Sequence, residues 1–300
     1  METLQALEKR IVTSGKLQSI VKSMKTLAAV SIRQYERAVD SLDTYVATIE
    51  FGLQVALRTA PLSLGRPRNG ETRRALVIFG SDQGLCGRFN ERLAGEVRAA
   101  FLAQAGEIDA ASPLLLVIGA RVAARLEAEG LTVQEQFWVP SSVTGINSNV
   151  FRVLLTLEQW QREHGVGRVD LHFNRRRQGN PAEPVRQALL PFDEAHFVEF
   201  ARRPWPSRCL PQARIPAATL FSALLRQHLF VSLFRAQAES LASEQASRLQ
   251  SLQNAEKNIG EHVEELKSEF RVKRQATITA ELLDLVAGYK VAARVHHGGA

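Results

Sequence analysis

The feature that most constrains this chain is a pair of long proline-free segments, one near each end, with apolar residues at helical spacing. In the first segment, residues 3–58, successive apolar residues from Ala28 onward are alternately four and three positions apart, as in a heptad repeat. The first segment predicts a helix about 80 Å long. The second segment begins at Ala217 and predicts a helix of roughly 70 residues, on the order of 100 Å long. Helices of this length need a partner along the apolar stripe. We therefore expect the two to pair.

The region between these segments has a different period. Compact apolar runs predict strands, and amphipathic stretches between them predict helices. The expected strands are Arg74–Ser81, Leu114–Gly119, Thr132–Val139 and Val169–Asn174, and the expected helices are Arg88–Gln104, Arg121–Glu129 and Asn149–His164. Seven prolines between Pro181 and Pro216 predict an irregular stretch, with one short strand at His196–Phe200.

These elements predict a fold of class α/β. A long antiparallel coiled coil of N- and C-terminal helices would carry a central Rossmann-like α/β domain. The expected divisions are the first coiled-coil helix at 1–60, the α/β domain at 72–205, the second coiled-coil helix at 215–290 and a tail at 291–300. Gly288 is a plausible point for the last helix to fray or end.

Composition narrows the classes of function. The formal net charge of +7 fits either an acidic partner surface or a solvated basic surface. The two cysteines, Cys86 and Cys209, form no CxxC pair, and no His/Cys cluster has metal spacing. The apolar run around 114–124 is too short to span a bilayer, and the N-terminus resembles neither a signal nor a transit peptide. We expect a soluble, cytoplasmic product that needs no cofactor.

A glycine-bearing turn follows the first expected strand, a place where α/β folds bind phosphate. It reads SDQGLCG and contains Ser81, Asp82, Gly84, Cys86 and Gly87. It is neither GxGxxG nor a P-loop, because no Lys-Ser/Thr follows the glycines. Its glycines therefore match neither phosphate-binding motif. Cys86 is expected to be a buried small residue rather than a nucleophile, because no histidine lies near it in sequence.

The first helix has a stretch without acidic residues, between Glu8 and Glu36. Six basic residues occur in it: Lys9, Arg10, Lys16, Lys22, Lys25 and Arg33. The residues alone favour a solvated basic face over contact with an acidic partner.

Three motifs, in order and suitably separated, resemble the gamma subunit of F-type ATP synthases. The first is Ile20–Ala29 (IVKSMKTLAA), and the second is Ser81–Gly87. The third lies in the last helix and comprises Ser243–Arg248 (SEQASR), Asn254, Ala255, Asn258 and Arg274–Leu282 (RQATITAEL). The resemblance covers nearly the whole chain, with the middle region weakest.

This resemblance implies a non-catalytic rotor shaft that couples ion flow through a membrane ring to ATP synthesis or hydrolysis. Its partners would be the alpha and beta subunits, the epsilon subunit and the c-ring, with no nucleic acid and no membrane contact except through the complex. It implies beta-subunit contacts at Lys22, Met24, Lys25, Arg274, Gln275 and Thr279. It also implies that the SDQGLCG turn is structural rather than a ligand site. The location it implies is the cytoplasmic face of the bacterial inner membrane.

The chain departs from the family pattern at Arg88, Phe89 and Arg271, and in the longer tail Tyr289–Ala300. These differences favour a divergent bacterial branch, of which sodium-translocating enzymes are one example. Three other functions compete with the rotor: a coiled-coil scaffold, a small nucleotide-binding α/β enzyme and, last, a nucleic-acid binder. The driving ion, the net direction, regulation and the role of the tail are not encoded in these motifs.

Overall fold

The computed structural model describes residues 3–59, 73–104, 112–191, 204–205, 207–209 and 211–297. The elements, in chain order, are α1 (Leu4–Thr59), β1 (Arg73–Phe79), α2 (Phe89–Gln104), β2 (Leu114–Ile118), α3 (Ala120–Ala128), β3 (Glu135–Phe137), α4 (Val143–His164), β4 (Val166–Arg177), β5 (Asn180–Leu190) and α6 (Ala217–His297). They divide into two compact units, which we describe separately. Unit 1 is Met1–Leu27 with Ser251–Ala300, and unit 2 is Ala28–Gln250.

Unit 2 contains a five-stranded sheet of order β3-β2-β1-β4-β5. Strands β3, β2, β1 and β4 are parallel to one another, and β5 pairs antiparallel with β4. Central strand β1 is buried on both faces, which explains why it reads as a continuous apolar run. The expected Rossmann-like α/β domain is confirmed.

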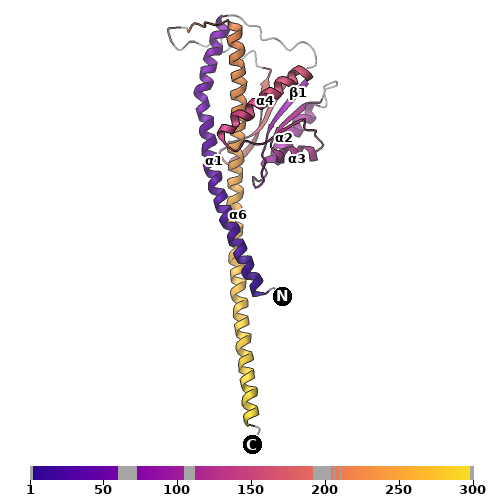
Figure 1. Cartoon of the computed structure of the whole chain (residues 1–300), viewed down its shortest axis with the longest axis vertical. Coiled ribbons are helices and arrows are strands. Elements are labelled where there is room, and N and C mark those ends of the chain that lie inside the picture. Colours follow the sequence, from indigo (N-terminus) through magenta and orange to yellow (C-terminus); the bar gives the residue numbers. More distant parts are fainter. Residues whose placement is uncertain are drawn as a thin grey trace. The chain divides into compact units, whose positions relative to one another are not determined.

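Helices cover both faces of this sheet (Figure 1). On one face, Leu76 and Ile78 of β1 pack with residues of α2 and α3 such as Leu93 and Leu126. On the other face, alternate residues of β1 pack with α4 and α6, and the members of this core include Val77, Phe79, Val150, Val153, Leu233 and Leu241. The sheet domain is therefore built directly onto the long helix α6.

The two long helices pair in each unit. In unit 2, Ile49, Leu53 and Ala56 of α1 form an apolar core with Phe221 and Val231 of α6. The hydroxyl of Tyr45 lies 3.0 Å from Oε1 of Gln227, and Asp43 pairs with Arg235, so α1 and α6 run in opposite directions. In unit 1, Lys25 pairs with Glu256, and a Cβ at Gly260 would lie 3.5 Å from the side chain of Gln18. The predicted antiparallel coiled coil is confirmed.

One helix of the described residues, within Ala217–Ala287, is long and apolar enough to cross a membrane, with a mean hydropathy of 1.3 over its most apolar window. Four apolar residues of α6 in this region, Phe221, Val231, Leu233 and Phe234, are buried in the cores of unit 2. Because 22% of that window is buried, packing on α1 and the sheet accounts for part of its apolar composition.

The structure corrects the prediction of an irregular stretch after Pro181. Residues Asn180–Leu190 form β5, an edge strand in which Pro184 faces Asn174 of β4. Proline is tolerated at a sheet edge because only one side of the strand must supply ladder hydrogen bonds. The expected strand at His196–Phe200 lies outside the described residues.

Two helix boundaries also differ. Helix α4 begins at Val143, six residues earlier than predicted, because Ser142 caps it and accepts a hydrogen bond from the amide of Gly145 at 3.3 Å. Helix α6 continues past Gly288, where fraying was expected, and ends at His297.

Candidate functional site

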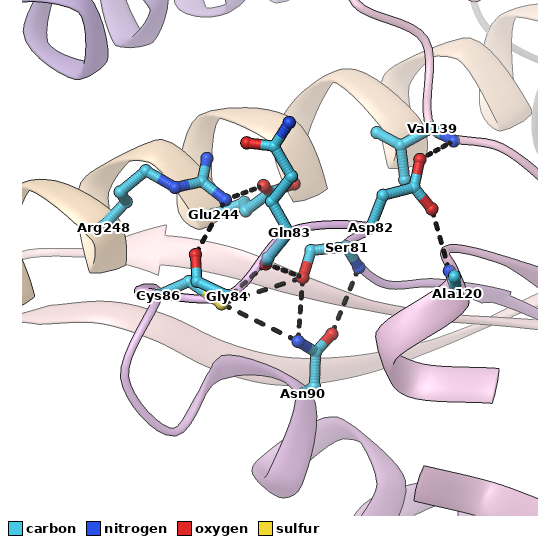
Figure 2. Close-up of polar contacts among 10 residues, drawn as sticks. All are labelled: Ser81, Asp82, Gln83, Gly84, Cys86, Asn90, Ala120, Val139, Glu244 and Arg248. Atoms are coloured by element: carbon cyan, nitrogen blue, oxygen red, sulfur yellow. Dashed lines mark hydrogen bonds and ion pairs between the residues drawn. The ribbon is translucent and has the colours of Figure 1, made fainter. Parts of the chain in front are cut away.

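The turn SDQGLCG connects β1 to α2, and Asp82 fixes one side of it (Figure 2). The two carboxylate oxygens accept hydrogen bonds from the amides of Ala120 and Val139, both at 2.8 Å. Ala120 is the first residue of α3, so the carboxylate occupies the amides and the positive dipole end that an anion would use. This geometry supports the expected structural turn, which stays a prediction.

Ser81 and Asn90 hold the other side of the turn. The amide of Ser81 donates to Oδ1 of Asn90 at 3.1 Å, and Nδ2 of Asn90 donates to Oγ of Ser81 at 2.8 Å. The thiol of Cys86 lies 3.7 Å from Oγ of Ser81 and is buried. Burial raises the pKa of the Cys86 thiol, and the hydrogen bond with Ser81 opposes that rise only in part. A thiol in this environment stays protonated at neutral pH, which is consistent with Cys86 being a buried packing residue rather than a nucleophile.

Close backbone packing beneath the turn requires glycine at two positions. Gly119 has φ +120°, and a Cβ there would lie 2.7 Å from the amide nitrogen of Ser81. A Cβ at Gly80 would lie 2.2 Å from Cγ1 of Val122. The turn is therefore pressed against the start of α3, with no space for a ligand between them.

Helix α6 contributes a polar face to the same site, formed by Ser240, Ser243, Glu244 and Arg248. Three of these side chains donate to backbone carbonyl oxygens of the sheet domain. Ser240 donates to Phe79 at 2.7 Å, Ser243 to Pro181 at 2.7 Å and Arg248 to Gly84 at 3.4 Å. Spacings of three, four and eight residues from Ser240 place all four on one side of the helix. We call this set the polar face of α6.

Glu244 and Arg248 form a buried ion pair within this face. Nη2 of Arg248 lies 2.6 Å from Oε1 of Glu244, and the two side chains are only 6% and 8% exposed. Burial raises the pKa of Glu244, and the Arg248 guanidinium counteracts that rise. The pKa of Tyr35 on α1 is also raised, mainly by burial and to a smaller extent by the negative charge of Glu244. The pair therefore lies where α1, α6 and the turn meet.

Leu85 lies within the SDQGLCG turn. It has φ 63°, in the left-handed region that side chains other than glycine rarely adopt, and it is 60% exposed. A conformation of this kind persists only when surrounding contacts enforce it. Sequence reasoning did not single out Leu85, Asn90 or Ser240, since each requires the fold to show its neighbours.

The residues expected to contact a beta subunit all lie in unit 1. Lys22 is exposed, Met24 is half-buried, and the half-buried Lys25 is paired with Glu256. Arg274, Gln275 and Thr279 are exposed on α6, and Thr279 donates from its hydroxyl to the carbonyl of Gln275 at 2.9 Å. The Lys25–Glu256 pair shows that the Lys22–Lys25 stretch lies about five turns of α6 away from Arg274. The two groups form separate surfaces rather than one site.

The C-terminal part of α6 carries a run of exposed apolar side chains: Val272, Ile278, Leu282, Leu283, Leu285 and Val286. Solvated helices seldom collect so many on one short segment, and such surfaces usually mark contacts with other proteins. Among the described residues, no group of three or more His, Cys, Asp or Glu side chains could hold a metal ion.

Fold and site together define a class of protein: a paired-helix shaft on which a small α/β domain is fixed by polar contacts, with Asp82 of its first turn capping α3. A family model described as ATP synthase matches residues 3–291, so the chain belongs to the ATP synthase family. Curated relatives within it are ATP synthase gamma chains. This chain is 26% identical to the one from Granulibacter bethesdensis, over 96% of this chain and 99% of that one. It is 27% identical to the one from a Geobacter species (strain M21), over 96% and 98%.

Solved structures show the same fold. A chain of the Euglena gracilis mitochondrial ATP synthase, in an OSCP/F1/c-ring structure, matches with a TM-score of 0.63 at 16% identity, covering 98% of this chain and 95% of that one. A chain of the Tetrahymena thermophila central stalk/c-ring structure matches with a TM-score of 0.55 at 19% identity, covering 79% and 99%. The resemblance predicted from the three sequence motifs is confirmed.

Proposed function

We infer that this chain is the central rotor stalk of an ATP synthase. It couples ion flow through a membrane ring to ATP synthesis or hydrolysis at an alpha–beta hexamer. Family membership over residues 3–291 and gamma-chain relatives that align over nearly their whole length support this role. Its partners are the alpha and beta subunits, the epsilon subunit and the c-ring.

One structural observation carries the mechanical part of the proposal. Helix α6 is continuous for 81 residues, and its C-terminal part exposes apolar side chains from Val272 to Val286. A long paired helix resists bending, and an apolar end fits a sleeve of partner subunits. Rotation of an asymmetric shaft in that sleeve would present a different face to each catalytic site and shift its nucleotide affinity.

The chain is the non-catalytic member of this enzyme complex. In support, the turn between β1 and α2 has no P-loop lysine, its Asp82 is used to cap α3, and burial raises the pKa of the Cys86 thiol. Association with the membrane is peripheral and passes through the complex, on the cytoplasmic face of a bacterial inner membrane.

The contacts with the beta subunits remain those expected from the family motifs: Lys22, Met24 and Lys25 on α1, and Arg274, Gln275 and Thr279 on α6. Exposed charged and polar side chains can exchange partners at small cost in free energy, as a sliding contact requires. Lys22 and Arg274, both exposed, fit this need.

Reconstitution tests the proposal. The chain, added to purified alpha, beta and epsilon subunits with the ring in liposomes, should restore ATP-driven ion pumping. Arg274→Ala should assemble normally but lower turnover about fivefold, the effect of one hydrogen bond worth about 1 kcal/mol. Arg271→Ala, one turn earlier and also exposed, is the matched control. Unchanged turnover in assembled Arg274→Ala enzyme would remove Arg274 from the contact.

A further inference from the structure

The polar face of α6 makes directional contacts at three separate points of the sheet domain. Ser240 bonds to the end of β1, Ser243 to β5 and Arg248 to the SDQGLCG turn. In each case the acceptor is a backbone carbonyl. These contacts therefore fix the position of the strands and the turn themselves rather than of particular side chains.

Apolar packing of α6 against the sheet also resists displacement, because the side chains of a close-packed core interdigitate. The hydrophobic effect itself is non-directional, so the polar contacts add a fixed direction and register to this packing. Hydrogen bonds weaken steeply when their geometry is lost, and a buried polar group that loses its partner keeps its full desolvation cost. Ser240 and Ser243 are 2% and 0% exposed, so their bonds cannot be replaced by water without opening the interface.

The ion pair adds a charged element to this interface. Breaking a buried pair strongly destabilises a protein, and buried polar groups can specify register between packed elements. Glu244 holds the guanidinium of Arg248, and Arg248 in turn reaches the carbonyl of Gly84 (Figure 2). Glu239, next to Ser240, adds a partly exposed pair with Arg175 of β4 at 2.6 Å.

We propose that the polar face of α6, centred on the Glu244–Arg248 pair, is the joint through which turning force passes between the shaft helix and the sheet domain. Glu244 and Arg248 are positioning residues in this joint. The proposal rests on the rotor function inferred above. It predicts that loosening the joint reduces coupling under load but leaves unloaded ATP hydrolysis intact.

Two double variants of the full chain test this in the reconstituted complex. Glu244→Leu with Arg248→Met replaces the pair by apolar residues of similar volume, a change that proteins often tolerate. Ser240→Ala with Ser243→Ala removes only two hydroxyl groups, in case the first variant fails to fold. The matched control is Lys257→Gln with Glu261→Gln, an exposed pair with the same spacing on the same helix. Arg248→Lys keeps a cation beside Glu244.

Two quantities are measured for each complex: the rate of ATP hydrolysis without an ion gradient, and the number of ions pumped per ATP against a gradient. Hydrolysis should stay close to wild type in every variant. Pumping per ATP should fall at least about threefold in both joint variants, because each loses a buried hydrogen bond worth about 1 kcal/mol, and remain normal in the control. Arg248→Lys, which keeps the cation but not the guanidinium, should lose less pumping than Glu244→Leu with Arg248→Met. A merely structural defect would instead lower the yield of assembled complex, the hydrolysis rate and the number of ions pumped per ATP together.

Joint variants that pump as wild type does against the full gradient would overturn the proposal. So would loss of pumping in the control to the same extent, or loss of unloaded hydrolysis in the same proportion as pumping. Failure of the wild-type chain itself to restore pumping would contradict the rotor function, which distinguishes the two inferences.

Discussion

The carboxylate of Asp82 caps helix α3 by accepting a hydrogen bond from the amide of Ala120 at 2.8 Å. Its second oxygen accepts from the amide of Val139. In nucleotide-binding α/β folds phosphate lies at the start of the helix that follows the first strand, which here is α2. Asp82 instead joins the turn to the start of α3 and to the segment after β3.

Asp82→Ala should destabilise the chain by about 2–4 kcal/mol, because two amides would lose a charged acceptor. Urea unfolding followed by circular dichroism measures this. Asp82→Asn is the matched control, because its amide oxygen can still accept one of the two hydrogen bonds and about half the loss should remain. An unfolding midpoint for Asp82→Ala equal to that of wild type would show that the cap has no energetic role.

Gly119→Ala should destabilise the chain by more than about 2 kcal/mol, since φ +120° and the 2.7 Å approach to the amide of Ser81 both oppose a side chain. Gly95 provides the control. It lies exposed within α2, where a Cβ would meet no atom within 4 Å, so Gly95→Ala should stabilise by roughly 0.5–1 kcal/mol. Thermal unfolding of the two variants should therefore shift in opposite directions. Equal shifts would contradict the packing described beneath the turn.

The pair between Lys25 and Glu256 separates two roles for Lys25. If the lysine mainly steadies the shaft, the exchange Lys25→Glu with Glu256→Lys should restore coupled pumping that Lys25→Glu alone reduces. If it touches an acidic partner, as we propose, the exchanged variant should stay as poorly coupled as the single one. Lys22→Glu, at an exposed position, should lower coupling in either case. The stability effect should be below about 1 kcal/mol, because the pair is about one-third exposed.

His172 makes the stability of unit 2 depend on pH. It is fully buried on β4, neither ring nitrogen has a hydrogen-bond partner, and burial lowers its pKa from 6.5 to about 4. Asp170 raises this pKa, whereas Arg186 and Arg74 lower it further. The unfolded chain therefore binds a proton between pH 6.5 and 4 that the folded chain excludes. One pKa unit is worth about 1.4 kcal/mol. The free energy of unfolding should therefore be at its full value above pH 6.5 and fall by about 3 kcal/mol as the pH is lowered to 4.

Replacing His172 with leucine should remove that part of the pH dependence, and it should leave stability at pH 7 equal or higher, because two unsatisfied nitrogens disappear. Urea unfolding at pH 7 and pH 5 measures both effects. An exposed histidine on α6, His262, gives the control, since His262→Gln removes an imidazole without emptying a buried site. A wild-type slope in His172→Leu would show that other groups dominate.

The sequence predicts the long helices and the parallel strands well, because their periods are set by local spacing. The heptad steps from Ala28 and the apolar run of β1 each indicate one element without reference to the rest of the chain. Strand β5 was missed because Pro181 and Pro184 oppose a strand locally, and only the edge position of that strand in the sheet removes the conflict.

The site is less predictable for a related reason. The SDQGLCG turn was correctly placed after a strand, and its interpretation as structural came from the family resemblance. Which helix it meets depends on contacts between residues more than 150 positions apart, such as Gly84 and Arg248. The motif Ser243–Arg248 therefore carried the family resemblance without revealing that it faces the turn.

Rotation of the assembled complex tests the rotor account most directly. Cys209 is exposed and Cys86 is buried, so a maleimide–biotin reagent should label Cys209 selectively and allow a gold nanorod to be attached there. With the alpha–beta hexamer fixed to glass, addition of ATP should produce continuous rotation of the rod in one direction. Hydrolysis of ATP by the labelled complex with a stationary or randomly fluctuating rod would contradict the account.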